Sequence, residues 1–234
     1  MNRFLSPQRL TDQSEIRLDE TETHHLTHVL RTEAGEKVLL VDGEGGQAVG
    51  RVVSTERSGA HIVIQSIERM AKPSHFGLAF GIPKAAALEF ILRRCTEIGV
   101  TDFQPLVTQH SHPSSFFNAD RWKRVVAEVS KQCQRLHFPA LLPPLRLGAY
   151  LSRRDETTPV YLCSETDREE RPSPPKGDAA EILIGSEGGW SEEELETLKK
   201  SGVFLLGLGE NRLRTETAAL AAAVRIQVLL ETQL

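Results

Sequence analysis

The sequence predicts two domains: a small β-barrel-like domain in residues 1–70, and an α/β domain with a parallel sheet in residues 74–234. In the first part, short apolar or alternating runs flank a glycine-rich hairpin signal, VDGEGG at 41–46. From residue 76 onward, apolar runs of strand length alternate with helical patterns, which is typical of a buried parallel sheet. Pro73, in the stretch RMAKPSH, marks the linker between them.

The first domain is predicted to be rich in strands, with one short helix between them. The expected strands are residues 15–18, 37–43, 47–53 and 61–68, and the helix covers about residues 22–30.

The second domain is predicted to alternate between strands and helices. The expected strands are residues 76–82, 102–107, 160–164, 181–186 and 203–208, and the expected helices are residues 85–98, 118–137 and an alanine-rich helix over about 218–230. In the first of these helices, Leu88, Ile91, Leu92 and Cys95 share one face. A charged, proline-rich loop is expected at 164–178.

The composition is that of a soluble globular protein, with 39% hydrophobic and 26% charged residues in 234. No apolar run reaches the roughly 20 residues of a membrane-spanning helix and no leader pattern is present, so we expect a cytoplasmic protein without a membrane partner. The three cysteines are too widely spaced for a disulfide framework. The histidine clusters at 24–28 and 110–112 have no carboxylate at a familiar ligand spacing, so no metal is expected.

The formal net charge of −4 hides an uneven distribution. Residues 1–71 carry −3, residues 72–154 carry +7 and residues 155–234 carry −8. A basic middle segment suits a localised contact with a polyanion, and it equally suits solvated helix faces.

Two glycine-rich turns follow apolar runs in the last quarter of the chain. In ILIGSEGGW (182–190) a strand ends in a tight turn, and Ser191 with Glu194 forms a capping-box signal for the next helix. In FLLGLGENRLRTETAAL (204–220), glycines and arginines precede the last helix, which Thr215 or Thr217 is expected to cap. Neither turn carries a dinucleotide or P-loop fingerprint. Each is also compatible with a plain tight turn, and the arginines with internal pairing to a glutamate.

The two turns together, LIGSEGGWSEEEL and LGENRLRTETAALAA, resemble the C-terminal motifs of the SPOUT class of methyltransferases. The sequence is most similar to the family that methylates N3 of uridine 1498 in 16S ribosomal RNA. The resemblance extends upstream through HHLTHVLR, VDG, PKAAALEFILRRCTEIGV and EVSKQCQRLHFP, so it covers nearly the whole chain.

The resemblance implies an N-terminal PUA-like RNA-binding barrel and a C-terminal SPOUT domain with a deep trefoil knot, which binds S-adenosyl-L-methionine and forms a homodimer. The three strand-end loops would form the cofactor pocket. The implied cofactor residues are Leu162, Ser164, Ile184, Gly185, Glu187, Gly188, Gly189, Leu206, Leu208, Gly209, Asn211, Leu213, Arg214 and Thr215.

The chain departs from the family pattern at several positions. Gln109 and His110 stand where the family has Glu-Arg after the second strand of this domain, and Ser186 replaces the proline of G-P-E-G-G. Arg94 stands in place of a lysine, and Gln134 in place of a glycine. The changes at 109 and 110 remove a charge pair near the expected substrate, so they bear on the target base more than on the cofactor.

The expected RNA contacts are basic and spread along the chain. On a helical wheel of residues 118–137, Trp122, Val125, Val126, Val129, Cys133 and Leu136 share one face, opposite a basic stripe. The candidates are Arg124, Lys131 and Arg135 from this stripe, with Arg3, His25, Arg31, Lys84 and Arg94 elsewhere. His25 is also compatible with a packed core position, and the stripe with an ordinary solvated face.

The chemistry requires a uridine N3 lone pair behind the electrophilic methyl group and a destination for the N3 proton. Arg214 is the candidate for stabilising the developing uracil anion or for positioning its carbonyl oxygen, and Glu187 and Glu216 are candidate bases. The expected partner is the small ribosomal subunit. The alternatives are the same fold acting on another RNA site such as a ribose 2′-OH, and a non-catalytic RNA-binding factor in ribosome assembly.

Overall fold

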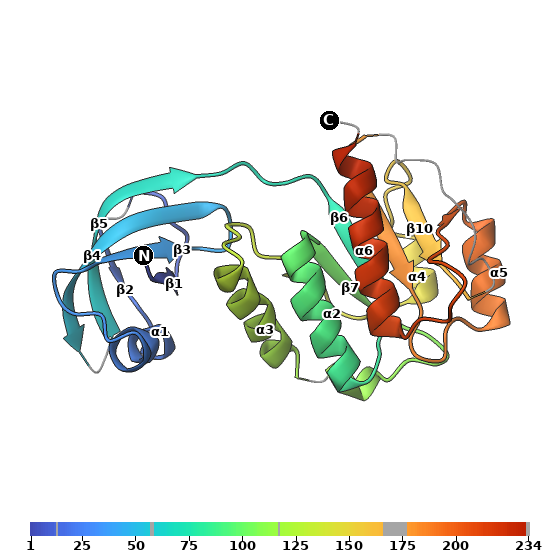
Figure 1. The fold of residues 1–234 in the computed structure, drawn as a ribbon, viewed down its shortest axis with the longest axis horizontal. Coiled ribbons are helices and arrows are strands. Elements are labelled where there is room, and N and C mark those ends of the chain that lie inside the picture. The colour runs from blue at the N-terminus through green and yellow to red at the C-terminus, as the bar shows by residue number, and fades with distance from the viewer. Residues whose placement is uncertain (13, 57–58, 117, 166–176, 233–234) are drawn as a thin grey trace. The chain divides into compact units, whose positions relative to one another are not determined.

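The computed structural model describes residues 1–12, 14–56, 59–116, 118–165 and 177–232, and it divides the chain into two compact units (Figure 1). Unit 1 comprises Met1–Pro73 together with Ser130–Phe138. Unit 2 comprises Ser74–Val129 and Pro139–Leu234. The sequence did not predict that residues 130–138 belong with the first unit.

Unit 1 is built on a five-stranded sheet in the order β1-β3-β4-β5-β2, in which only β1 and β3 are parallel. Its strands are β1 (Arg3–Leu5), β2 (Glu15–Arg17), β3 (Lys37–Val41), β4 (Gly46–Glu56) and β5 (Gly59–Arg69). Two register shifts in the β4–β5 pair, at Val49/Gly50 and Val52/Ser54, are irregularities of the kind that bend a sheet. The short helix α1 (Glu20–His24) begins at Asp19, whose side chain accepts the Glu22 N–H at 2.8 Å, and continues as the π-helical segment η1 (His25–Val29).

The core of unit 1 forms because alternate residues of these strands are apolar and face inward. Its fully buried members are Phe4, Leu10, Ile16, Leu18, Leu26, Val38, Leu40, Ala48, Val52, Ala60 and Ile62.

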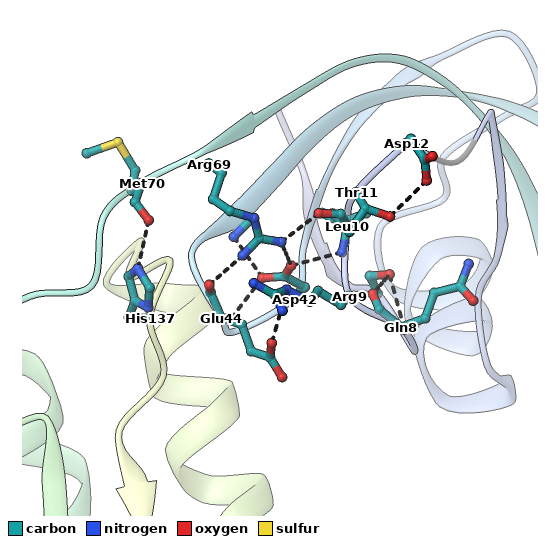
Figure 2. A network of polar contacts seen from close by, with 12 residues as sticks. Gln8, Arg9, Leu10, Thr11, Asp12, Asp42, Glu44, Arg69, Met70 and His137 are labelled. Carbon is teal, nitrogen blue, oxygen red and sulfur yellow. Dashed lines mark hydrogen bonds and ion pairs between the residues drawn. The ribbon is translucent and has the colours of Figure 1, made fainter.

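Residues 130–138 are fixed to the rest of unit 1 by backbone and side-chain contacts. The hairpin between β3 and β4 exchanges hydrogen bonds with them: Gly45 N donates to Leu136 O and Phe138 N to Gly43 O, both at 2.8 Å. His137 Nε2 donates to Met70 O at 3.1 Å, as Figure 2 shows. Lys131 forms a mostly buried ion pair with Glu22.

Unit 2 is built on a seven-stranded parallel sheet in the order β12-β10-β11-β6-β7-β8, with β9 also pairing β7. Its strands are β6 (Phe76–Gly81), β7 (Asp102–Val107), β8 (Ala140–Leu141), β9 (Leu145–Arg146), β10 (Val160–Cys163), β11 (Ala180–Ile184) and β12 (Phe204–Leu205). β6 is buried along its full length and β10 likewise, as expected for strands covered on both faces.

Helices cover both faces of this sheet (Figure 1). One face packs against α2 (Ala85–Ile98), the first part of α3 (Ala119–Gln132) and α6 (Thr215–Glu231). The other packs against α4 (Leu147–Leu151) and α5 (Glu192–Lys200). A 3₁₀ turn, η2 (Pro113–Phe116), precedes α3.

The predicted helix over 118–137 is too long. α3 ends at Gln132, and Gln134 then adopts φ of 65°, a left-handed conformation that disfavours a side chain. Cys133 is exposed and lies beyond the helix, so the predicted apolar face stops at Val129. Most of the predicted loop at 164–178 lies outside the described residues. Within the described ranges, no helix is both long and apolar enough to cross a membrane.

Candidate functional site

A cavity of about 720 Å³ lies in unit 2 where β10 and β11 end. Its walls come from the segments that follow these strands, from residues 208–216 before α6, and from the start of α2. In parallel sheets, ligands bind outside the carboxyl ends of the strands, and this cavity has the volume of a small-molecule site.

The turn after β11 is tight because of a hydrogen bond and a positive φ within its own backbone. Gly189 N donates to Ser186 O at 2.8 Å, and Gly189 has φ of +69°, which favours glycine. A Cβ at Gly185 would lie 2.9 Å from the backbone of Gly189, so a side chain there would open the turn. Gly185 and Gly189 are therefore required by the shape of the turn, which leaves its backbone bare along the cavity.

Side chains fix the ends of this turn. Ser191 caps α5 in a full capping box: Glu194 N donates to Ser191 Oγ, and Ser191 N donates to Glu194 Oε2. Trp190 Nε1 donates to Cys163 O at 3.2 Å, which joins the turn to the end of β10. Burial raises the pKa of the Cys163 thiol, so it stays protonated and offers no thiolate to the cavity.

The segment before α6 delivers Arg214 to the cavity. Arg214 is the N-cap of α6 with extended backbone and no capping side chain, so the prediction of Thr215 or Thr217 as the cap was wrong. The Arg214 side chain is exposed, with no hydrogen bond or ion pair to any residue in the described ranges. Arg212, in contrast, pairs with Glu165 at 2.8 Å.

Glu187 lines the cavity and also holds the start of α2. Its Oε1 accepts the Lys84 N–H at 2.9 Å, and its Oε2 lies 3.9 Å from His112 Nε2. These contacts give Glu187 an architectural role at the cavity wall.

The structure brings most of the predicted cofactor residues together. Twelve of the fourteen line the cavity, as do the candidate catalytic residues Arg214, Glu187 and Glu216. Leu162 and Leu206 do not: both are almost fully buried in the core behind the wall, because their side chains point into the packed layers of the sheet.

Sequence reasoning missed several wall residues. Those not assigned to the site are Ala86, Ala87, Cys163, Glu165, Ser186, Trp190, Glu192, Leu195, Arg212 and Ala218. Ser186, Trp190 and Arg212 stand within the two glycine-rich motifs, and that proximity was the available signal.

The predicted RNA-binding residues are divided between the two units. Lys84 lies at the cavity, while Arg124, Arg31 and Arg94 are exposed, with Arg94 paired to Glu97. The basic stripe predicted along one helix is wrong, because Lys131 is mostly buried against Glu22 and Arg135 lies beyond the helix end.

In the first strand and helix of unit 1, the two remaining RNA candidates are partly buried. His25 lies edge-on to Phe4, with ring centroids 5.9 Å apart. The Arg3 Nη1 atom is buried without a hydrogen-bond partner in the described part of the chain. Across that same part, no group of three or more His, Cys, Asp or Glu side chains is arranged to hold a metal ion.

The sequence matches two family models. Residues 70–227 match the model described as RNA methyltransferase domain, and residues 18–65 match that described as RNA methyltransferase PUA domain. A Synechocystis protein named ribosomal RNA small subunit methyltransferase E is 29% identical over 97% of this chain and 77% of its own. The Bacillus subtilis protein of the same name is 26% identical over 93% and 91%.

Solved structures agree in fold. The Neisseria gonorrhoeae ribosomal RNA small subunit methyltransferase E, solved bound to S-adenosyl methionine, superposes with a TM-score of 0.87 at 28% identity and 98% coverage of both chains. A probable rRNA-methyltransferase from Porphyromonas gingivalis superposes with a TM-score of 0.86 at 27% identity and full coverage of both. With the family model matching two thirds of its length, the chain belongs to the RNA methyltransferase domain family.

Proposed function

We propose that this protein uses S-adenosyl-L-methionine to methylate N3 of a uridine in the 16S RNA of the small ribosomal subunit, at the position of uridine 1498. The observation that carries the proposal is the cavity at the strand ends, walled by two glycine-rich turns and an exposed arginine, in a chain of the RNA methyltransferase family. The names of the relatives from Synechocystis and Bacillus subtilis support the RNA of the small ribosomal subunit as the substrate.

The lining fits this cofactor. The volume of about 720 Å³ lies within the roughly 300–1,000 Å³ typical of small-molecule sites. Apolar side chains for an adenine ring, such as Ile184, Leu195 and Leu208, stand beside the bare backbone of the turn. Carboxylates and guanidinium groups are both present, as a ligand with a sulfonium, an ammonium and a carboxylate requires. When bound, S-adenosylmethionine supplies an electrophilic methyl group.

Arg214 has the freedom to act on the substrate. Because its guanidinium pairs with no group in the described ranges, its N–H donors are available to a uracil carbonyl oxygen. Such donors stabilise the charge that develops on the ring as N3 loses its proton. Glu187 is engaged by the Lys84 N–H, so we assign it a positioning role and keep Glu216, in the first turn of α6, as the candidate proton acceptor.

We assign the remaining functions by unit. Unit 1 contacts RNA, supported by the PUA-domain match, with Arg3, His25 and Arg31 as its candidate contacts and Lys84, Arg94 and Arg124 in unit 2. Unit 2 carries the trefoil knot of the SPOUT class. The protein works in the cytoplasm as a homodimer through α6, where Val224 and Val228 are 42% and 55% exposed.

The test is a methyl-transfer assay with labelled cofactor and small ribosomal subunits that lack N3-methyluridine. The RNA is digested to nucleosides, which are identified by mass spectrometry. We expect N3-methyluridine at one site, and none with heat-inactivated protein. A 2′-O-methylated nucleoside would contradict the N3 assignment. Cofactor binding without any transfer would indicate the non-catalytic alternative.

A further inference from the structure

The loop after β7, residues 108–112, is hydrogen-bonded to the turn after β11 and to the first turn of α5. Gln109 N donates to Glu194 Oε1 at 2.8 Å, and Ser186 Oγ donates to His110 O at 2.7 Å. Ser186 is 3% exposed, so this hydrogen bond is shielded from water.

The same loop is also closed by an internal hydrogen bond and joined to the residue that follows β6. Ser111 Oγ donates to Thr108 O at 2.8 Å, and His112 N donates to Ile82 O at 2.7 Å. Three of these four hydrogen bonds join the loop to α5, to the turn after β11 and to the residue that follows β6, so they fix the position of the His110 backbone.

This anchoring places His110 directly against Gly188, a residue of the cavity wall. A Cβ at Gly188 would lie 2.7 Å from His110 Cβ and 2.9 Å from His110 Cγ. Gly188 has no left-handed φ, so the close approach of His110 is what requires glycine there. The imidazole itself is exposed, and no hydrogen bond to its ring occurs among the described residues.

An exposed, flat, heteroaromatic ring on a fixed backbone, next to the cavity wall at Gly188, has the properties of a stacking platform for a nucleobase. RNA bases that are turned out of a helix stack on aromatic and histidine side chains. We propose that His110 stacks on the target uracil, and that Ser186 and Glu194 are positioning residues that hold His110 beside Gly188. This inference rests on the proposed function and names the residue that meets its substrate.

The test compares kcat/KM for small ribosomal subunits among variants of the full chain. His110→Ala removes the ring, and we expect kcat/KM to fall by about 10-fold or more, with cofactor affinity unchanged within twofold. His110→Phe keeps the flat face without the ring nitrogens, so it should restore most of the loss. A role that depends on the ring nitrogens of His110 predicts no such rescue, because phenylalanine lacks those nitrogens as alanine does.

Ser186→Ala tests positioning. It removes the bond to His110 O, so we expect a loss of about threefold, and the double variant with His110→Ala should match His110→Ala alone within twofold. Ser152→Ala is the matched control, because Ser152 Oγ makes a similar bond, to Gly148 O at 2.9 Å, at the end of α4. It should leave kcat/KM unchanged.

The outcomes separate this inference from the proposed function. If the wild-type protein is active and His110→Ala leaves kcat/KM unchanged, the role of His110 is overturned. Additive losses of kcat/KM in the double variant would overturn the positioning role of Ser186. If the wild-type protein transfers no methyl group, the proposed function is wrong. The equilibrium affinity of the protein for small ribosomal subunits then tests the stacking role. Affinity for subunits should then still drop about 10-fold in His110→Ala and recover in His110→Phe, and equal affinities would refute stacking.

Discussion

Replacing Asp42 with asparagine tests the polar network that closes the β3–β4 hairpin. The Asp42 side chain is 1% exposed and accepts four hydrogen bonds, as Figure 2 shows in part. Its Oδ1 accepts the N–H groups of Glu44 and Gly46, both at 2.8 Å, and its Oδ2 accepts Leu10 N at 2.9 Å and Arg69 Nη2 at 2.8 Å. Arg69 donates further to Leu10 O and Glu44 O, so one ion pair ties together the N-terminal loop, the hairpin and the end of β5.

The size of the expected stability loss follows from the hydrogen bonds that asparagine can still accept at position 42. Its single oxygen can accept for one of the two carboxylate oxygens, while its NH₂ group faces two donors and leaves the Arg69 charge without a counterion. A hydrogen bond to a charged group contributes about 1.5–3 kcal/mol net. Breaking a buried pair by removing one partner costs about 3–5 kcal/mol. We expect unit 1 to lose stability of about 3–5 kcal/mol.

The loss should depend on pH in a defined direction. Burial by itself raises the pKa of Asp42, but the four donors outweigh it and hold the pKa below its usual value. The stabilisation is therefore complete above the unfolded pKa of about 3.9 and is lost as pH falls through the folded value. The difference between wild type and Asp42→Asn should shrink under acid conditions.

The assay must report unit 1 separately, because a two-unit chain has no single unfolding equilibrium. Amide hydrogen exchange in peptides from β3, β4 and β5 reports unit 1, while tryptophan fluorescence reports unit 2, because Trp122 and Trp190 both lie there. Asp12→Asn is the control, because Asp12 is exposed and accepts only from Thr11 Oγ1 among the hydrogen bonds in Figure 2. If exchange protection in these strands falls by less than about fivefold in Asp42→Asn, the reasoning is refuted.

Three further changes test unit 2. Arg214→Ala should lower the rate of single-turnover methyl transfer by about 100- to 1,000-fold, while the cofactor affinity measured by calorimetry stays within a few fold of the wild-type value. Equal losses in both would exclude a role for Arg214 in the transition state. Val224→Glu places a charge on the exposed face of α6, so it should give monomers in sedimentation velocity and weaken cofactor binding. A stable monomer with unchanged cofactor affinity would contradict dimerisation through α6. Burial raises the pKa of Glu181, so unit 2 loses stability as pH rises above the ordinary glutamate pKa. Glu181→Gln should raise the urea midpoint of unit 2, followed by tryptophan fluorescence, at pH 8 but not at pH 4, and equal shifts at both would contradict this.

The elements that could be predicted from the sequence are those with a clear hydrophobic periodicity or a continuous buried apolar run. The helix predicted at 85–98 and the strand predicted at 102–107 have those bounds in the structure, because each has a clear apolar pattern. β1, β8 and β9 have two or three residues each, too few to show any period, and were not predicted.

The site was predictable to the extent that it lies in the glycine-rich motifs. The misplaced residues, Leu162 and Leu206, belong to the apolar strand ends, where one residue of offset decides whether a side chain faces the cavity or the core. The basic stripe failed for a different reason. Lys131 looks solvent-facing on a helical wheel, but its partner Glu22 lies 109 residues away in the sequence, and no local pattern reveals such a pairing.

The discontinuous composition of unit 1 has a consequence for how the protein is made. Residues 130–138 supply Lys131 to buried Glu22 and complete the backbone pairing of the hairpin at Gly43 and Gly45, so unit 1 lacks these contacts when residue 73 leaves the ribosome. Synthesis of the next 65 or so residues takes about 3–13 s at 5–20 residues per second. During that interval the Glu22 carboxylate has no cation opposite it. Full consolidation of the N-terminal unit is therefore a late event in translation, after α2 and the first strands of unit 2 have emerged.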